Sequence, residues 1–343
     1  MGDTELLTQA QAGDADAFEA VVAPYRGGLF RHCYRMLGSP HDAEDALQES
    51  LLGAWRGIAG FEGRSSLQSW LYRIATHACL RLISRRPSRV LSPDYGPSRT
   101  RTDDLGEPVP GPVWIEPLPD TSYADEHLPA AETSYLERES VELAFTAALQ
   151  QLPGNQRAVL ILRDVMGYSA AEVADLLDTS VASANSALQR ARTSVEERST
   201  GTSQRDELER LGDEGQRQLV DAFVAAWESA DVPALLDLLR ADVRFTMPPL
   251  PAWFDGRDAV AGFLTERLFA TPWRLTPVGV NGQLGFGCYI LEPGAGAYKL
   301  GAVNVLTLRD GKVADITGFL DPDALRNFGL PVEPPEKFLP ADR

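Results

Sequence analysis

The 343-residue chain has few cysteines and no long apolar run. Its three cysteines, Cys33, Cys79 and Cys288, lie far apart and form no CxxC pair, so neither a disulfide framework nor a zinc site is indicated. No apolar run approaches the roughly 20 residues that a membrane-spanning helix needs. The acidic N-terminal stretch lacks the charged-then-apolar pattern of an export signal. We therefore expect a cytoplasmic protein that carries no structural metal and no cofactor.

Positive charge is also scarce: 32 Lys and Arg stand against 49 acids, a formal net charge of −17. One segment departs from this balance, because residues 60–89 hold six Arg and a single acid, Glu62. Apolar residues at steps of three and four predict one buried helix face there: Leu67, Leu71, Ile74, Ala78 and Leu82. Cationic residues at steps of four follow another face: Arg73, His77, Arg81 and Arg85. Concentrated cations in an acidic protein indicate an anionic partner, with nucleic acid as the first candidate.

The length of the chain exceeds what one ordinary core needs and predicts two or three domains. Composition divides it into a helical segment, a proline-rich acidic linker, a second helical segment, a segment that ends in strands, and a tail: 1–88, 89–132, 133–200, 205–330 and 331–343. Residues 87–130 hold nine prolines, few aliphatic residues and many acids. This composition predicts an extended linker without a core of its own.

Helix-start signals precede three of the helical patterns. Residues 39–42 (Ser-Pro-His-Asp) form a capping-box pattern, and Ser65 or Ser66 caps the basic helix. A second capping box at 169–172 (Ser-Ala-Ala-Glu) opens a short helix, which a turn at 178–180 joins to a longer, polar-faced helix. Two helices joined by a tight turn predict a helix-turn-helix.

The last large segment begins with an amphipathic helix and continues with strand-like runs at 243–247, 273–280, 286–291, 298–308 and 313–320. Residues 309–312 (Arg-Asp-Gly-Lys) predict a hairpin turn between the last two strands.

Two stretches carry a family resemblance. Residues 42–80, DAEDALQESLLGAWRGIAGFEGRSSLQSWLYRIATHACL, closely resemble region 2 of the extracytoplasmic-function sigma factors, small members of the sigma-70 family. Residues 152–192, LPGNQRAVLILRDVMGYSAAEVADLLDTSVASANSALQRAR, resemble their region 4, and residues 212–330 look like a SnoaL-like domain of the NTF2-like cone fold. The resemblance implies a multidomain protein: two all-α sigma domains, a region 2 helical bundle and a region 4 helix-turn-helix, followed by an α+β cone domain.

The resemblance also implies an alternative RNA polymerase sigma factor that has no catalytic turnover. Such a protein binds the clamp and flap of core RNA polymerase and directs promoter recognition and transcription initiation. The polymerase-binding residues it implies are Asp45, Gln48 and Glu49. The residues it implies for the promoter −10 element are Arg64, Trp70, Arg73, His77, Arg81 and Arg85. Arginines suit phosphates, and Trp70 and Tyr72 are candidates for base stacking, although Trp70 also fits the buried stripe.

The resemblance places the second helix of the helix-turn-helix in the major groove of the −35 element. Its exposed candidates are Ser183, Asn185, Ser186, Gln189, Arg190 and Arg192. The chain departs from many members of the family, which have Lys or Arg where it has Asn185 and Ala187. Arg157 and Arg163 could add contacts to DNA or to the polymerase flap. Because residues 143–199 hold five Arg and six acids, we expect little DNA binding without polymerase.

The acidic linker has two interpretations: a tether between the two DNA-reading domains, or a nucleic-acid mimic in the polymerase channel that uses Asp94, Asp103, Asp104 and Glu107. Acids between Asp94 and Glu139 could also shield the basic helix in the free protein. The tail is expected to pack back on the rest of the chain.

The C-terminal domain contains no histidine, because the four histidines are His32, His41, His77 and His127. The domain therefore lacks the residue that most often serves as general acid or base in a cavity. We expect it to be a regulatory or binding module, and no separate anti-sigma factor is required. Polar and aromatic residues that could line a pocket for a small-molecule ligand are Trp227, Asp242, Trp253, Tyr289 and Asn304, with Asp315 and Phe286 as further candidates. The aromatic candidates fit a packed core better than the wall of a pocket. The alternative functions are a SnoaL-like ligand-processing enzyme and a helix-turn-helix regulator that senses a small molecule.

Overall fold

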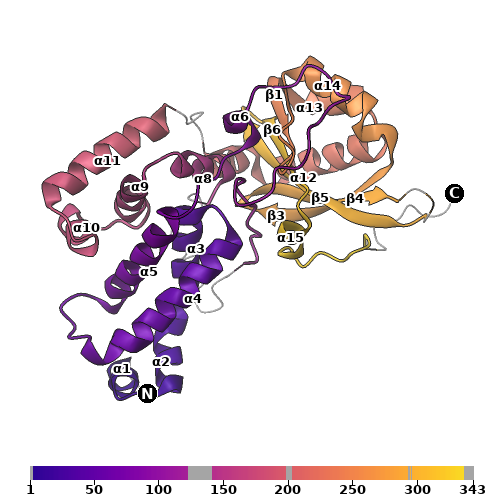
Figure 1. Ribbon diagram of the computed structural model, residues 1–343. Helices are drawn as coiled ribbons and strands as arrows, with labels where there is room; N and C mark the ends of the chain where they lie inside the picture. The colour runs from indigo at the N-terminus through magenta and orange to yellow at the C-terminus, as the bar shows by residue number, and fades with distance from the viewer. Residues whose placement is uncertain (1–2, 123–140, 198–202, 293, 295, 336–343) are drawn as a thin grey trace. The chain divides into compact units, whose positions relative to one another are not determined.

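The computed structural model describes residues 3–122, 141–197, 203–292, 294 and 296–335, and the chain divides into two compact units (Figure 1). The first, which we call the helical unit, comprises Met1–Arg89 and Thr121–Ser199. The second, the sheet unit, comprises Val90–Asp120 and Thr200–Arg343. Among the described residues, no helix is both long and apolar enough to cross a bilayer.

The helical unit packs α3, α4 and α5 against one another over buried residues such as Phe30, Leu47 and Leu71. Its described helices are α1 (Asp3–Gln11), α2 (Ala15–Val22), α3 (Arg26–Leu37), α4 (Pro40–Gly57), α5 (Leu67–Ile83), α8 (Leu143–Gln150), α9 (Gly154–Leu160), α10 (Ala170–Leu176) and α11 (Val181–Glu196). A π-helical turn, Ile161–Val165, continues α9.

The expected helix starts of α4 and α5 are confirmed. The Ser39 hydroxyl accepts a hydrogen bond from the N–H of Asp42 at 3.2 Å, and Pro40 occupies the first turn of α4. Ser66, rather than Ser65, caps α5, since its hydroxyl accepts from the N–H of Ser69 at 3.1 Å. Both caps satisfy backbone donors that have no partner within the helix.

The helix-turn-helix is also confirmed. The Ser169 hydroxyl accepts from the N–H of Glu172 at 3.2 Å, and the Glu172 carboxylate accepts from the N–H of Ser169 at 2.7 Å. Residues 177–180 then join α10 to α11, with Asp178 at a φ of 50°. Ser180 caps α11 by accepting from the N–H of Ser183 at 3.1 Å.

The sheet unit has one mixed sheet with the strand order β2-β1-β6-β5-β4-β3. Its strands are β1 (Leu239–Thr246), β2 (Trp253–Asp255), β3 (Trp273–Val280), β4 (Gln283–Leu291), β5 (Tyr298–Arg309) and β6 (Lys312–Phe319). Its helices are α6 (Ser92–Tyr95), α12 (Gln204–Glu228), α13 (Val232–Leu238), α14 (Arg257–Glu266) and α15 (Pro322–Arg326). β1 runs parallel to β6, and all other neighbouring strands are antiparallel.

Every strand expected from the sequence is present, with ends shifted by a few residues. The expected hairpin turn is confirmed at Asp310 and Gly311, whose φ angles of 54° and 73° are those of a two-residue turn. The short strand β2 was not expected, because three residues are too few to show an alternating pattern.

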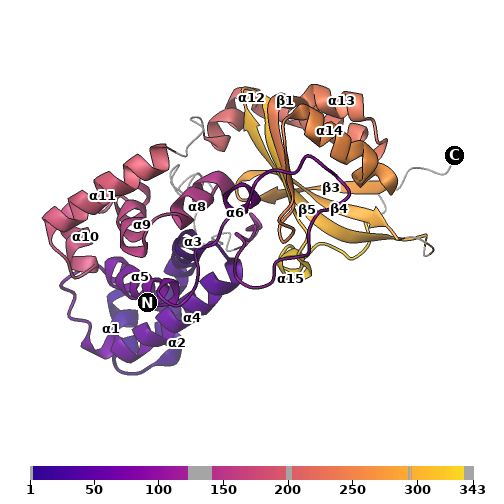
Figure 2. The same ribbon diagram turned by 45° about the horizontal axis from the view of Figure 1, so that its top comes forward.

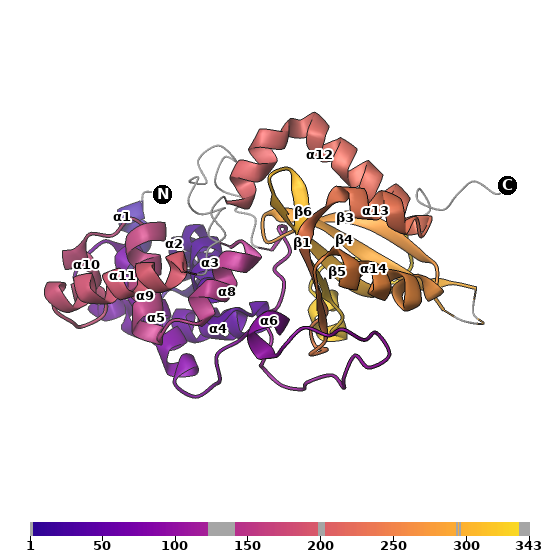
Figure 3. The ribbon, with the colours of Figure 1, turned by 90° about the horizontal axis from the view of Figure 1, so that it is seen from above.

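Aromatic side chains fill the space between α12 and the sheet. Figure 3 shows α12 lying across the sheet. Phe223 of α12 stacks on Phe286 of β4 with ring centroids 5.0 Å apart, and on Trp227 at 5.3 Å. Trp227 in turn stacks on Phe245 of β1 at 6.3 Å. The domain is therefore of the expected α+β class, with a core built from rings.

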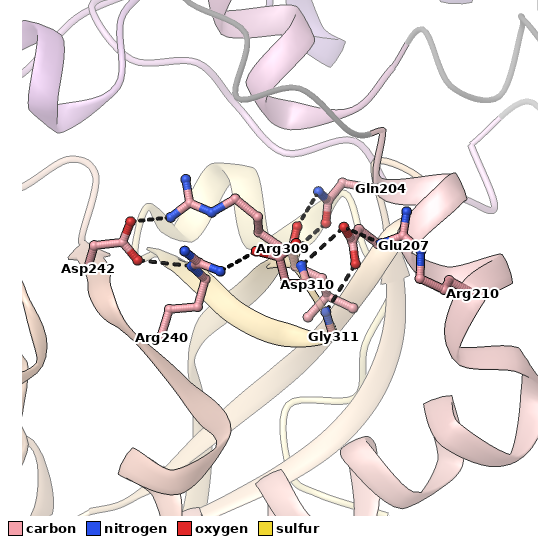
Figure 4. A network of polar contacts seen from close by, with 9 residues as sticks. Gln204, Glu207, Arg210, Arg240, Asp242, Arg309, Asp310 and Gly311 are labelled. Carbon is pink, nitrogen blue, oxygen red and sulfur yellow. Dashed lines mark hydrogen bonds and ion pairs between the residues drawn. The ribbon is translucent and has the colours of Figure 1, made fainter.

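The first turn of α12 is fixed to the turn between β5 and β6 (Figure 4). The Glu207 carboxylate, whose side chain is 1% exposed, accepts from the N–H groups of Asp310 and Gly311, both at 3.1 Å. The Gln204 side chain exchanges hydrogen bonds of 2.9 and 2.6 Å with the backbone of Leu308. The chain therefore enters the sheet unit at a hydrogen-bonded position.

Residues 90–120, expected to form an extended linker, pack within the sheet unit (Figure 2). Trp114, Ile115 and Leu118 are 6%, 0% and 4% exposed. The carbonyl of Trp253, on the edge strand β2, accepts from the N–H of Arg99 at 2.7 Å. The Trp253 indole N–H donates to the carbonyl of Gly96 at 2.8 Å. Burial of these apolar residues outweighs the extended tendency of the prolines.

The end of the linker is bound at the opposite edge of the sheet. The N–H of Asp120 donates to the carbonyl of Gly279 on β3 at 3.1 Å. Asn281, in the turn between β3 and β4, donates from its N–H to the carbonyl of Leu118 at 2.8 Å and accepts from the N–H of Leu118 at 2.9 Å. Asp120 packs against the Cα of Gly279, and a side chain at that position would meet the Asp120 carboxylate.

Candidate polymerase and nucleic-acid interfaces

One face of α4 is exposed and carries the three residues expected to bind polymerase, Asp45, Gln48 and Glu49. Leu52, one turn further along, is 56% exposed and adds a large apolar side chain to this face. It lies off the buried stripe of α4, and its spacing from Gln48 and Glu49 was the signal that the sequence interpretation missed. The face thus combines carboxylates with one apolar side chain.

The cationic residues of α5 form a stripe, as their spacing predicted, but most of them are in contact with oxygens of the protein itself. Arg73 Nη2 lies 2.6 Å from Asp178 Oδ1. His77 Nε2 lies 3.2 Å from the carbonyl oxygen of Leu176 and 3.6 Å from Asp178 Oδ2. Arg81 Nη2 lies 2.6 Å from Glu49 Oε1.

The remaining basic residues of this region differ in their contacts. Arg85 is exposed in the turn that follows α5, and Arg64, in the loop before α5, is 88% exposed and lies 3.2 Å from Glu62. Arg86 and Arg89 instead form hydrogen bonds with the carboxylate of Asp42, the Arg89 contact measuring 2.6 Å. These last two arginines hold the end of the basic segment against α4.

The two aromatic candidates for base stacking differ. Trp70 is half-buried, and its ring lies 5.2 Å from that of Phe61. Tyr72 is only 2% exposed and packs edge-on against His32 at 5.3 Å. The expectation that Tyr72 could stack on a base is therefore wrong for this conformation, since its ring belongs to the core. Burial in turn lowers the pKa of His32 to about 3.

The six residues of α11 expected to face DNA are all exposed: Ser183, Asn185, Ser186, Gln189, Arg190 and Arg192. Ala187 is 9% exposed and belongs to the packed face of α11, so the small residue at this position is explained by packing. The Arg192 guanidinium forms two hydrogen bonds with the Asp164 carboxylate, at 2.8 and 2.7 Å, and this contact raises the pKa of Arg192.

The expectation that Arg157 reaches DNA or the flap is wrong, because its side chain is buried between α9 and the end of α3. Arg157 is 2% exposed and donates hydrogen bonds to the carbonyl of Met36, to the Gln150 side chain at 2.6 Å, and to the carbonyls of Gln150 and Leu152 at 2.9 and 3.0 Å. Burial lowers the pKa of Arg157 to about 10. Arg163 is half-buried and donates to the carbonyl of Tyr168 at 2.6 Å.

The residues proposed for a ligand pocket do not converge. Trp227 lies in the aromatic core, and Trp253 lies at the β2 edge with its indole bound to the linker. The Tyr289 hydroxyl donates to the carbonyl of Pro331 at 3.1 Å, in the chain that follows α15. Asn304 is buried on β5 opposite Gly318.

The acidic pocket candidates are bound to arginines. Asp242 forms ion pairs with Arg240, at 3.0 Å, and with Arg309 (Figure 4). Asp315 lies 2.6 Å from Arg244, and burial raises the pKa of Asp315. In the described ranges, no group of His, Cys, Asp and Glu is arranged to hold a metal. A shallow hollow of about 390 Å³ lies elsewhere, between the linker and the loops after β1 and β6.

Family models match three parts of the chain. The model for sigma-70 region 2 matches residues 21–89, that for sigma-70 region 4 matches residues 142–195, and that for a SnoaL-like domain matches residues 220–316. The last two matches cover the helix-turn-helix and most of the sheet unit.

Among curated proteins, the ECF RNA polymerase sigma factor SigG of Mycobacterium tuberculosis is 40% identical over 321 residues, which cover 92% of this chain and 84% of SigG. The ECF RNA polymerase sigma factor SigW of Bacillus subtilis is 30% identical over 190 residues, 54% of this chain and 90% of SigW. Among solved structures, the M. tuberculosis extracytoplasmic function sigma factor SigJ has a similar fold, with a TM-score of 0.59 at 23% identity, covering 93% of this chain and 100% of SigJ.

Proposed function

Because this chain belongs to the extracytoplasmic-function sigma factors of the sigma-70 family, we propose that α4 binds core RNA polymerase while α5 and α11 read promoter DNA. The protein is an RNA polymerase sigma factor, and sigma factors act by binding core polymerase and promoter DNA. The observation that supports the assignment of surfaces is the exposure of an acidic face on α4, a cationic stripe on α5 and a polar face on α11.

The polymerase-facing surface consists of Asp45, Gln48, Glu49 and Leu52. The carboxylates suit a basic partner and orient it at long range, whereas Leu52 supplies apolar area that is lost from water on binding. A pull-down of core polymerase by Leu52→Ser compared with Leu51→Val tests the surface. The first change affects an exposed side chain and the second a buried one, so reduced binding for Leu52→Ser alone supports the proposal.

The two DNA-reading surfaces differ in chemistry. Arg73, Arg81 and Arg85 supply phosphate contacts along single-stranded DNA of the −10 element. Asn185, Ser186 and Gln189 present uncharged hydrogen-bonding groups to base edges in the major groove of the −35 element. The −35 surface thus depends on base contacts more than on phosphate neutralisation, which limits its affinity for DNA in isolation.

The sheet unit regulates the distance available between the two DNA-reading surfaces. Both chain segments that connect it to the helical unit are hydrogen-bonded to its sheet: residues 96–120 at β2 and β3, and residues 204–207 at the turn between β5 and β6. A bound linker spans less distance than a free one, so its release is what lets region 2 and region 4 separate fully. Aromatic side chains are packed in the core of the sheet unit, which favours regulation over catalysis.

Run-off transcription with core polymerase and a genomic promoter library tests the regulatory part. Asn281→Gly removes the side-chain acceptor for Leu118 while keeping the positive φ of the turn, 56°. We expect it to raise transcript yield about five-fold, since one net hydrogen bond is worth about 1 kcal/mol. Ala230→Gly is the matched control, because Ala230 also has a φ of 56°. Equal yields from both variants and the wild type would contradict regulation through the linker.

A further inference from the structure

The cationic stripe of α5 is occupied by oxygens from two other elements of the helical unit. Asp178, in the turn between α10 and α11, contacts Arg73 at 2.6 Å and His77 at 3.6 Å. Glu49, on α4, contacts Arg81 at 2.6 Å. Arg73 and Arg81 therefore already have an anionic partner at the distance that a DNA phosphate would take, and His77 lies beside the same carboxylate as Arg73.

The backbone at Asp178 places its carboxylate on the stripe. Its φ of 50° is rare for residues other than glycine, asparagine and aspartate. The turn around it is closed by a hydrogen bond of 2.8 Å from the N–H of Thr179 to the carbonyl of Ala174. The carbonyl of Leu176, two residues before Asp178, accepts a hydrogen bond from His77 Nε2 at 3.2 Å. The end of α10 thus presents a carboxylate and a carbonyl to α5.

The contact at Asp178 lies at the rim of a larger buried interface. Region 4 inserts Arg157 against the carbonyl of Met36, and Gln150 Nε2 donates to the carbonyl of Arg35 at 3.0 Å. Gly154 of α9 approaches Leu80 of α5 so closely that a Cβ there would lie 3.1 Å from the leucine. The position of the α10–α11 turn over α5 is consequently fixed by packing as well as by charge.

We propose that Asp178 and Glu49 are internal substitutes for DNA phosphate, and that polymerase and promoter binding must displace them before α5 can read the −10 element. This proposal rests on the proposed function of α4, α5 and α11. Glu49 belongs to the surface assigned to polymerase, and Asp178 to the motif assigned to the −35 element. Each partner that binds its own surface therefore also frees cations on α5.

The arrangement couples the assembly of the transcription complex to promoter opening. In the free protein, the stripe has little unpaired positive charge with which to bind DNA phosphate, although it is rich in arginine. When polymerase takes Glu49, Arg81 is freed, and when region 4 leaves region 2, Arg73 and His77 are freed. Exposed ion pairs of this kind are individually weak, so each should change DNA affinity by about two- to five-fold.

The test measures DNA binding by the full chain in the absence of polymerase. The probe is a short fluorescein-labelled single-stranded oligonucleotide of mixed sequence, followed by fluorescence anisotropy. Asp178→Asn removes the charge at a position where asparagine tolerates the positive φ, so the turn is preserved. Asp175→Asn is the matched control, because it removes the same charge from the exposed side of α10.

We expect Asp178→Asn to tighten binding about two- to five-fold, Glu49→Gln to tighten it by a similar factor, and the double variant to approach the product. Asp175→Asn should change binding less than two-fold, because it only lowers the net negative charge of the protein at a site away from the stripe. Adding Arg73→Ala to Asp178→Asn should remove the gain, because the gain requires the freed arginine.

Two results would overturn the proposal: Asp178→Asn binding no better than Asp175→Asn, or a gain that persists when Arg73 is replaced. Run-off transcription by the wild-type holoenzyme is measured beside it. If the wild-type holoenzyme transcribes from promoters but Asp178→Asn does not bind the oligonucleotide more tightly, only this inference is wrong. If the wild-type holoenzyme shows no promoter-dependent transcription, the proposed function itself is wrong.

Discussion

The two helices that face DNA, α5 and α11, solve the same problem with opposite chemistry. α5 carries a cationic stripe whose members are held by Asp178 and Glu49. The exposed face of α11 is mostly uncharged apart from Arg190 and Arg192, and Arg192 is held by Asp164. Neither helix offers much free positive charge, one because its charge is paired and the other because it has little. The comparison teaches that a helix can have low affinity for DNA either because its cations are paired with carboxylates or because it has few cations. Mutations distinguish the two causes.

The largest expected effect breaks the buried interface between region 2 and region 4, which carry these two helices. Arg157→Leu removes a buried guanidinium and leaves the carbonyls of Met36, Gln150 and Leu152 without this donor. We expect the free energy of unfolding to fall by about 3 kcal/mol, because buried acceptors lose their partner. Urea denaturation of the full chain measures it, with the exposed Arg190→Leu as control. Similar values for the two variants would show that Arg157 does not hold the interface.

A second, smaller effect concerns the anchor of α5 to α4. Burial raises the pKa of Asp42, but hydrogen bonds from Arg86 and Arg89 outweigh it and set the pKa below its ordinary value of 3.8. A lowered pKa in the folded state stabilises the fold above pH 3.8, and this stabilisation is lost as the pH falls through the folded-state value. We expect Asp42→Asn to lower the free energy of unfolding by about 2 kcal/mol at neutral pH.

The difference between wild type and Asp42→Asn should shrink as the pH is lowered below 4, since the wild-type carboxyl then takes up a proton too. Denaturation curves recorded across this pH range measure it. Asp45→Asn, on the exposed face of the same helix, should change stability by less than about 0.5 kcal/mol at every pH. A constant difference across the range would contradict the ion pair with Arg86 and Arg89.

A third prediction adds charge to the helix that lacks it. Asn185→Lys places a cation on the exposed face of α11. The variant therefore tests whether the small number of cations on this face limits its affinity for DNA. We expect duplex binding without polymerase to strengthen several-fold, and the slope of log affinity against log salt to steepen by about 0.9 if one phosphate is contacted. Anisotropy titrations at several salt concentrations measure both. An unchanged slope would place residue 185 away from the DNA backbone.

The smallest effect compares Arg81, in the last turn of α5, with Arg85, just after the end of that helix. Arg81 is paired with Glu49, whereas Arg85 is exposed. In the free protein, Arg81→Ala should therefore weaken single-strand binding less than Arg85→Ala, by a difference of about two-fold. In a Glu49→Gln background the two should become equal. If Arg81→Ala is the more damaging variant in the wild-type background, masking by Glu49 does not occur.

Local signals predicted much of the fold. Ser39, Ser66 and Ser169 cap helices as their patterns indicated, because a capping hydroxyl needs only its own helix. The turn at Asp310 and Gly311 likewise follows from two residues that tolerate positive φ. The exposed faces of α4 and α11 followed from helical periodicity. The candidates for a pocket do not come together, since alternation along a strand cannot say which side chains from distant segments meet.

The linker shows where composition misleads. Nine prolines and many acids indicated an extended tether, and the described part does lack long regular elements. Yet Ile115 and Leu118 are buried, and Asp120 is bound at the β3 edge. Few apolar residues are enough to fix a segment in place when a sheet edge offers unpaired backbone groups, because the sheet provides the hydrogen-bond partners and the core that the segment lacks.

The sequence by itself determined the family, the order of the parts, the helix starts and which helix faces are charged, since all of these depend on residue type and short-range spacing. Only the tertiary structure decided the partners of those charges. Arg73 and Asp178 are separated by more than a hundred positions in the chain, and Arg157 is a surface residue by type but a buried one in fact. Pairing at such separations depends on how helices pack, and packing is a property of the whole chain rather than of any segment.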